Sequence, residues 1–255
     1  MTIPDNVTSI GYEAIYNCRG LKGVYITDIE KWCKISFDYM SNPLVYAHNL
    51  YLNNKLVTDL VIPDSVTSIG NNAFKNCSGL TSITIPDSVT SIGVYAFWNC
   101  SGLTSITIPD SVTCIGWSAF GTCRGLTSIM IPDSVTIDHS AFYNCSGLIS
   151  VTIGNGVNIG EEAFYECSGL ISVTIGNGVN IGDSAFKNCS GLISVTIENG
   201  VTSIGNFAFR YCSSLTKIMF NGSVSQWKTI KKKNLWGEDV TSDCKIYCTD
   251  GTISI

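Results

Sequence analysis

The sequence has few charged residues: they make up 14% of its 255 residues, against roughly 25% in ordinary soluble domains. Serine, threonine, asparagine and glycine take the polar positions instead, and the formal net charge is -5 at pH 7. A protein that binds nucleic acid needs a concentrated basic face. The composition therefore predicts no nucleic-acid partner.

Long apolar runs are also absent. No segment approaches the roughly 18 consecutive apolar residues of a membrane-spanning helix, so the sequence predicts no membrane span. Residues Met1 to Asp5 include neither the basic region nor the apolar segment of a signal peptide. We therefore expect either a cytosolic chain or a chain whose export signal lies outside these residues.

Catalytic and metal-binding patterns are scarce as well. The two histidines, His48 and His139, are far apart in the sequence, and no glycine-rich phosphate loop occurs. Because an enzyme needs a cluster of perturbed titratable groups in one pocket, we predict a protein that is not an enzyme and uses no cofactor. Cys244 and Cys248 could pair or bind a metal, but a zinc site wants four ligands, and we expect no metal site.

Repetition dominates the sequence. The segment IPDSVTSIGNNAFKNCSGLTSIT recurs in steps of 23 and then 22 residues, and an earlier copy covers residues 3–25. The regular copies begin at Ile62, Ile85, Ile108, Ile131, Ile153, Ile175 and Ile197. Repeats of this length are typical of solenoids, in which stacked coils share one continuous core.

Each copy predicts the same coil. Ile83 and Ile85 alternate with polar residues, which indicates a short strand with its apolar side inward. Ala96 and Phe97 begin the connecting arc, which we expect to be a turn or a short α- or 3₁₀-helix. Phenylalanine recurs at one position of that arc and predicts a buried column: Phe74, Phe97, Phe120, Phe142, Phe164, Phe186 and Phe209.

The twelve cysteines follow the repeat rather than a disulfide framework. Eight of them share one repeat position: Cys18, Cys77, Cys100, Cys123, Cys145, Cys167, Cys189 and Cys212. Because free cysteine behaves as a small buried apolar residue with a weak donor, we predict a reduced, buried column. The redox state of Cys33, Cys114, Cys244 and Cys248, which lie outside the column, stays open.

The pattern LTSITIPDSVTSIGNNAFKNC resembles the BspA-like, or Treponema pallidum-type, class of leucine-rich repeats. The resemblance covers nearly the whole chain. It implies a right-handed solenoid with short parallel strands on one face and turns or short helical or 3₁₀ arcs on the other. It also implies a surface or secreted protein of the kind that adheres to host proteins or to other cells.

Two irregular segments interrupt the array. We expect one solenoid domain over 1–255, divided into a first repeat (1–25), a modified coil with a hairpin insert (26–61), seven regular repeats (62–219) and a C-terminal cap (220–255). In the modified coil a short helix would begin at Ile29 and end at Asn42-Pro43, and Asn53-Asn54 would form a tight turn. The spacing of Val224, Trp227 and Ile230 predicts a second such helix in the cap.

The lysine run Lys231 to Lys233 has two interpretations. It can be a solvated edge that discourages further stacking, or a site for an anionic partner. At the other end of the chain, Ile10, Ala14 and Leu21 have no preceding coil to cover them. An uncovered coil end is a template for association, so we expect either a fragment of a longer array or self-association through this N-terminal edge.

The candidate binding surface is the outward side of the strands. Its residues alternate with the core positions, and serine and threonine can occur there simply because they suit exposed strands. They are Ser82, Thr84, Ser105, Thr107, Ser128, Met130, Ser150, Thr152, Ser172, Thr174, Ser194, Thr196, Lys217 and Met219. We predict a non-catalytic module that binds a protein partner, such as a host matrix or surface protein, through this face. The alternative is a structural spacer or an intracellular interaction scaffold within a longer chain.

Overall fold

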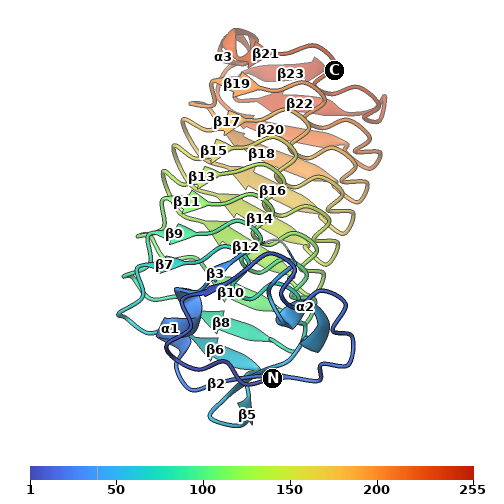
Figure 1. Cartoon of the computed structure of the whole chain (residues 1–255). Helices are drawn as coiled ribbons and strands as arrows, with labels where there is room; N and C mark the ends of the chain where they lie inside the picture. The colour runs from blue at the N-terminus through green and yellow to red at the C-terminus, as the bar shows by residue number, and fades with distance from the viewer. Residues whose placement is uncertain (39) are drawn as a thin grey trace.

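The computed structural model describes residues 1–38 and 40–255. The chain forms a stack of coils with its two termini at opposite ends (Figure 1). Each regular coil contributes one strand to each of two parallel sheets, and strands pair with their counterparts 22 or 23 residues away. In the described ranges no helix is both long and apolar enough to cross a membrane.

The first sheet carries the longer strands of each coil. Its three-stranded part pairs β6 (Asp59–Val61), β8 (Ser82–Thr84) and β10 (Ser105–Thr107). Its seven-stranded part contains β12 (Ser128–Ile131), β14 (Ser150–Ile153), β16 (Ser172–Ile175), β18 (Ser194–Glu198), β20 (Lys217–Asn221), β22 (Lys245–Cys248) and β23 (Gly251–Ser254). The hydrogen-bonded ladder therefore breaks between β10 and β12, although the two strands lie beside each other (Figure 1).

The second sheet is made of two-residue strands. Its members are β7 (Ser68–Ile69), β9 (Ser91–Ile92), β11 (Cys114–Ile115), β13 (Thr136–Ile137), β15 (Asn158–Ile159), β17 (Asn180–Ile181), β19 (Ser203–Ile204) and β21 (Lys231–Lys232). In the seven strands β7 to β19 an isoleucine points into the core while the residue before it faces outward. The second inward position of each repeat thus builds a sheet of its own.

The connecting arc of each regular coil is a series of turns, so the helical alternative is wrong. Asn72 and Asn76 have positive φ angles of 60° and 63°, which a helix does not tolerate. This backbone directs alternate N–H groups along the stack: Phe74 N donates to Ala96 O at 2.7 Å and Asn76 N to Trp98 O at 2.7 Å. The remaining N–H groups bond within the arc, as when Lys75 N donates to Asn72 O at 3.0 Å.

The predicted phenylalanine column is confirmed. All seven rings are fully buried. Neighbouring rings stack with centroids 5.0 to 5.4 Å apart and planes within 9° of parallel. In the first coil Ile15 is the buried residue at this repeat position, with 6% exposure. The core continues without interruption from Ile3 to Ile246.

The cysteine column lies beside the phenylalanines, and all twelve cysteines are free thiols. From Cys100 to Cys212 each column thiol donates to a phenylalanine carbonyl of the preceding coil, at 3.1 to 3.2 Å. Burial raises the pKa of Cys77 and Cys145 to about 12. Placing Cys18 in the buried column was wrong: it is exposed, because no coil covers the outer side of the first repeat.

The modified coil builds most of the N-terminal end. It contains α1 (Ile29–Cys33), α2 (Leu44–Ala47), β3 (Ser36–Phe37), which pairs with β1 (Ser9–Ile10), and the hairpin of β4 (Leu50–Leu52) and β5 (Lys55–Leu56). β4 also pairs with β2 (Val24–Ile26). The predicted turn at Asn53-Asn54 is confirmed, with φ angles of 49° and 64°.

The helix boundary at Asn42-Pro43 was wrong. The first helix ends at Cys33, and Pro43 stands at the start of α2. Proline is well suited to a helix start, where its missing N–H is not needed. Asn42 Oδ1 accepts a hydrogen bond from Leu44 N at 2.8 Å, while its Nδ2 donates to Asn72 O at 2.6 Å. This buried asparagine therefore joins the modified coil to the first regular one.

The C-terminal segment packs on the last regular coil. Helix α3 (Val224–Thr229) has a capping box between Ser223 and Gln226, and Trp227 is buried with 4% exposure. Its indole packs edge-to-face against Phe220, with centroids 5.2 Å apart. The antiparallel strand β23 then completes the seven-stranded sheet.

Candidate binding face

All fourteen residues predicted from the sequence lie on the outward side of seven neighbouring strands of the first sheet, which we call the strand face. The parallel register places like residues opposite each other: Ser150 pairs with Ser172 and Thr152 with Thr174. Met130 stands opposite Thr152 and is 68% exposed. The structure therefore brings the predicted residues together as two continuous columns, interrupted only where the ladder breaks between β10 and β12.

The first end of the strand face carries a carboxylate that the sequence interpretation missed. Asp59 on β6 stands opposite Ser82. It accepts hydrogen bonds from Ser82 Oγ at 2.5 Å and from Thr58 Oγ1 at 2.9 Å. These bonds hold the pKa of Asp59 below its ordinary value. The other outward residue of β6, Val61, is 65% exposed.

The hairpin of β4 and β5 borders this end of the face. An open hollow of about 370 Å³ lies between the hairpin and β6, lined by Leu52, Leu56, Val57 and Val61 among others. Leu56 is also exposed. The insert that breaks the repeat therefore adds an apolar recess to one end of the polar columns.

The opposite end of the strand face is basic. Lys217 on β20 pairs with Lys245 on β22, and Met219 pairs with Tyr247. The Lys217 ammonium lies 5.5 Å from the centre of the Tyr247 ring. The long axis of the face thus runs from a carboxylate at Asp59 to two lysines.

A column of exposed isoleucines flanks the hydroxyl columns. Ile149, Ile171 and Ile193 are 54%, 40% and 46% exposed, and the backbone joins them directly, with Ile171 N donating to Ile149 O at 2.9 Å. Full-length repeats have threonine at this position. The sequence signal for the column is the change from GLTSITI in full-length copies to GLISVTI in the shortened copies. We call these three residues the isoleucine column.

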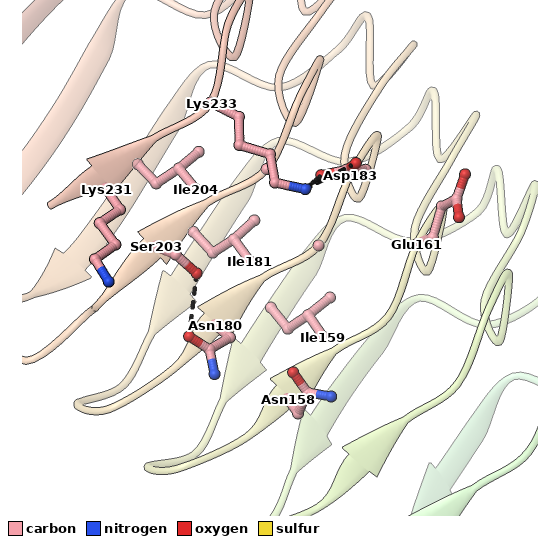
Figure 2. A pocket seen from close by; sticks show the side chains of 12 residues that line it. Asn158, Ile159, Glu161, Asn180, Ile181, Asp183, Ser203, Ile204, Lys231 and Lys233 are labelled. Carbon is pink, nitrogen blue, oxygen red and sulfur yellow. Dashed lines mark hydrogen bonds and ion pairs between the residues drawn. The ribbon is translucent and has the colours of Figure 1, made fainter.

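A second open hollow, of about 450 Å³, lies on the second sheet (Figure 2). Asn158, Asn180 and Ser203 form its outward column, and Ser203 Oγ donates to Asn180 Oδ1 at 3.1 Å. Lys233 reaches across to Asp183, with Nζ 3.0 Å from Oδ1. Two of its four charged side chains, Lys233 and Asp183, are thus paired with each other, and Glu161 and Lys231 also line the hollow.

The lysine run is partly structural. Lys232 donates to the carbonyl of Ile230 at 3.0 Å and lies 4.8 Å from the centre of the Trp227 ring, so it closes the end of α3. Lys233 is paired with Asp183. Lys231 is exposed on the last strand of the second sheet.

Cys244 and Cys248 are the two cysteines that the sequence leaves open as a disulfide or as metal ligands. Cys244 is buried and Cys248 half-buried, both as free thiols. Within residues 1–38 and 40–255, no three His, Cys, Asp or Glu side chains lie close enough together to hold a metal ion.

Parallel strands that recur every 22 or 23 residues over a column of buried phenylalanines define a leucine-rich-repeat solenoid. A family model described as the BspA type leucine rich repeat region matches residues 1–43, 47–168 and 136–236, in six copies. The chain belongs to this family. None of the curated proteins compared with it matches.

Several solved structures are similar to this chain. A leucine rich cell surface protein from Faecalibacterium prausnitzii is 27% identical, with 90% of this chain and 81% of that chain covered and a TM-score of 0.47. A leucine-rich repeat protein from Eubacterium ventriosum is 22% identical, covering 98% and 66%, with a TM-score of 0.58. The pneumococcal vaccine antigen PcpA is 18% identical, covering 98% and 67%, with a TM-score of 0.57. The last two share the fold.

Proposed function

We propose that this protein is a non-catalytic binding module that holds a protein partner against the strand face. The supporting observation is the isoleucine column: three large apolar side chains stand exposed in consecutive coils beside the Ser and Thr columns. An exposed apolar column with few charges beside it fits the apolar, charge-depleted core of a protein interface. A surface built only for solubility has no use for aligned exposed isoleucines.

The dimensions of the strand face also favour a protein over a small ligand. The face is an open sheet of parallel strands rather than a cavity, and it spans at least seven coils. A stable protein interface needs about 800 Å² from each partner, which a surface of this length can supply. The carboxylate at Asp59 and the lysines at Lys217 and Lys245 would then set the direction in which an asymmetric partner binds.

Membership of the BspA-type family supports a location on the cell surface or outside the cell, with a host matrix or surface protein as partner. The alternative is a structural spacer in a longer protein. The spacer needs no recognition surface, so the isoleucine column separates the two hypotheses. Neither hypothesis includes catalysis.

The test is capture of the purified chain on immobilised fibronectin, laminin and fibrillar collagen. We expect saturable binding to at least one, reduced about tenfold or more by Ile171→Asp. Asn158→Asp introduces the same carboxylate on the outward side of the second sheet and serves as the matched control. Failure to bind any of these proteins, or equal loss in both variants, contradicts the proposal.

Surface location has its own test. Antibodies against the folded chain should label intact cells of the source organism, and protease treatment of those cells should remove the label. Labelling only after the cells are lysed contradicts surface display.

A further inference from the structure

The arcs opposite the strand face differ from coil to coil in a way that the rest of the repeat does not. The two positions that flank the Ala-Phe pair hold polar residues such as Asn72 and Lys75 in the first regular coil, and Ser184 and Lys187 in the sixth. The intervening coils carry aromatic arc residues instead, at these positions or, for Trp117, two residues before the alanine. The seventh coil also has aromatic arc residues, Phe207 and Tyr211, so the distinguishing feature of the intervening coils is that their rings contact one another.

The aromatic side chains come together on the surface. We call the set the aromatic patch: Tyr95, Trp98, Trp117, Tyr143 and Tyr165. Tyr95 lies 5.5 Å from Trp98 and 5.2 Å from Trp117, measured between ring centroids, and Trp98 stacks parallel to Tyr143 at 6.2 Å. Tyr143 in turn stacks on Tyr165 at 5.8 Å. The patch therefore extends over four consecutive coils.

A glycine makes room for the patch. Trp98 and Tyr143 are two coils apart, and Gly121 occupies the matching position in the coil between them. A Cβ atom at Gly121 would collide with the Trp98 indole. Gly121 does not have a positive φ, so the backbone conformation does not require glycine there. The space taken by the Trp98 indole does. The coil is adapted to let Trp98 reach Tyr143.

The patch is open to a ligand. Trp117 is 44% exposed, and the four other rings are half-buried. An open hollow of about 620 Å³ adjoins Tyr95 and Trp98, with Phe37 and Asn42 of the modified coil on its other side. Sites for small ligands have volumes of about 300–1,000 Å³, so the hollow has the size of such a site.

The hollow is lined by amides. Asn71, Asn72 and Asn76 contribute to its wall. Asn71 Oδ1 accepts from Val94 N at 2.8 Å, and Asn76 Oδ1 accepts from Asn99 Nδ2 at 3.0 Å, which fixes both side chains in place. Each amide still has donors to offer, because an asparagine side chain has two N–H groups and one carbonyl oxygen.

The charges around the patch are already paired. The Lys75 ammonium lies 4.5 Å from the centre of the Tyr95 ring and so occupies the position a cationic ligand would take. On the far side, Glu166 accepts a hydrogen bond from Tyr143 Oη at 3.1 Å, and Glu162 lies 3.7 Å from His139. These carboxylates disfavour an anion. What remains is Asp38, a carboxylate in the wall of the hollow, and uncharged groups: aromatic rings beside fixed amides.

We propose that the aromatic patch and its hollow bind a neutral oligosaccharide of pyranose sugars. A pyranose presents apolar C–H groups on its faces and hydroxyl groups around its rim. Aromatic rings match the former and amide side chains the latter. The site lies on the arcs and shares no residue with the strand face, so it does not depend on the function proposed above.

The observations favour a sugar over a second protein partner. A protein interface is a broad surface of about 800 Å² per partner. Aromatic residues are enriched there too, so the size of the site and not the rings distinguishes the two partners. The patch instead lies beside a hollow of ligand size, and its exposed side chains are rings and amides. Binding of a protein but no sugar at this site would be the contrary result.

The experiment is titration of the whole chain with cellohexaose, maltohexaose, mannohexaose and chitohexaose, followed by tryptophan fluorescence and calorimetry. We expect saturable binding of at least one of them. Trp117→Ala and, separately, Tyr95→Ala should each raise its Kd about tenfold or more. Trp117 is 44% exposed and lies outside the buried core, so we expect its removal to leave the fold intact, which the melting temperature checks.

Two control variants locate the binding site. Tyr211→Ala removes an exposed aromatic residue from the arc of the seventh coil, which does not carry the patch. Ile171→Asp alters the side of the molecule that carries the strand face. Both should leave the Kd within about twofold. Four sugars without binding, or binding that survives both patch substitutions or falls equally with either control, overturns the proposal. Because Ile171→Asp abolishes only protein capture, failure here is distinguishable from failure of the strand-face function.

Discussion

The first coil and the middle coils are built from the same repeat, yet they bury different parts of it. Phe142 and Cys145, in the middle of the array, have no exposed surface. In the first coil Ile15 is buried, whereas Ala14 and Cys18 are exposed. The repeat thus determines the path of a coil, but burial comes from its neighbours on both sides. A residue in an end coil therefore contributes less to the free energy of unfolding than the residue at the same repeat position in a middle coil.

Substitutions in the phenylalanine column should show the largest contrast. Phe142→Ala removes a fully buried ring stacked on both sides, and we expect a loss of about 3–5 kcal/mol in the free energy of unfolding. Ile15→Ala at the end coil should cost no more than about 2 kcal/mol. Urea denaturation of both variants measures the difference. Equal losses would show that end coils are as tightly packed as middle ones.

Alkaline pH should destabilise the protein through the middle coils. The pKa of a column thiol such as Cys145 is raised to about 12 by burial, above the ordinary value of 9.0. The stabilisation is therefore complete below pH 9 and is lost as the pH rises toward 12, because the unfolded chain releases protons that the folded chain retains. Each such thiol contributes a slope of about 1.4 kcal/mol per pH unit.

The measurement compares unfolding free energies between pH 8 and 10.5 for the wild type and a Cys145→Ala/Cys167→Ala variant. Over this range the variant should lose about 4 kcal/mol less in total than the wild type, because the unfolded thiols ionise as the pH passes 9. Identical losses in the two proteins would show that the column thiols titrate normally.

The joint between the modified coil and the array gives a smaller effect. Trp32 Nε1 donates to Ala73 O at 2.9 Å, and Trp32→Phe removes this buried bond while keeping an aromatic ring. Asn42 Nδ2 also reaches Ala73 O, at 3.3 Å, so the acceptor keeps one partner and the loss should be about 1 kcal/mol. Thermal melts check it. A loss as large as that of Phe142→Ala would mean that the modified coil folds first and supports the rest.

Thiol reactivity compares the first coil with the middle coils in the unmodified protein, without any substitution. In the folded protein Ellman's reagent should modify Cys18 quickly and the column cysteines only slowly, because they are buried. In denaturant all twelve cysteines should react, as the prediction of a reduced column requires. Finding most of them oxidised would contradict it.

The weakest expected effect is association through the first coil. Ile10 and Leu21 are half-buried and Ala14 is exposed there, so two such ends could cover each other. We expect the molar mass from light scattering to rise with concentration, and Ala14→Lys to suppress the rise. Tyr247→Lys, near the opposite end, should not. A constant monomer mass across the range would refute self-association at this edge.

The sequence predicted the interior better than the surface. Isoleucine and phenylalanine at fixed intervals have one stable arrangement, a shared core, so the columns followed directly. The arc at Ala96 and Phe97 was less determined, because the positive φ of Tyr95, 54°, is imposed by hydrogen bonds to the next coil. The amino-acid composition of a single arc does not indicate these hydrogen bonds between coils.

The candidate surfaces were predicted in part, for a related reason. The strand face follows from alternation, and its residues lie where the pattern places them. The exposure of Ile171 was not predicted, because in the sequence an isoleucine next to the core residue Leu170 looks like a second core residue. Only the path of the folded coil shows that it points outward. The contacts between Trp98 and Tyr143 depend on a side chain passing over Gly121, a relation between coils that a one-dimensional repeat does not express.

Alternate N–H groups of the arcs, like the hydrogen bonds of both sheets, bond from coil to coil along the stack. The molecule therefore responds differently to force along the stack and across it. Tension applied between the two ends loads one coil boundary after another, so the stack should yield by peeling rather than by a single rupture. Each detached coil of 22 or 23 residues would release roughly 75 Å of extended chain. A tether made in this way would lengthen in equal increments under load while its remaining coils kept their shape.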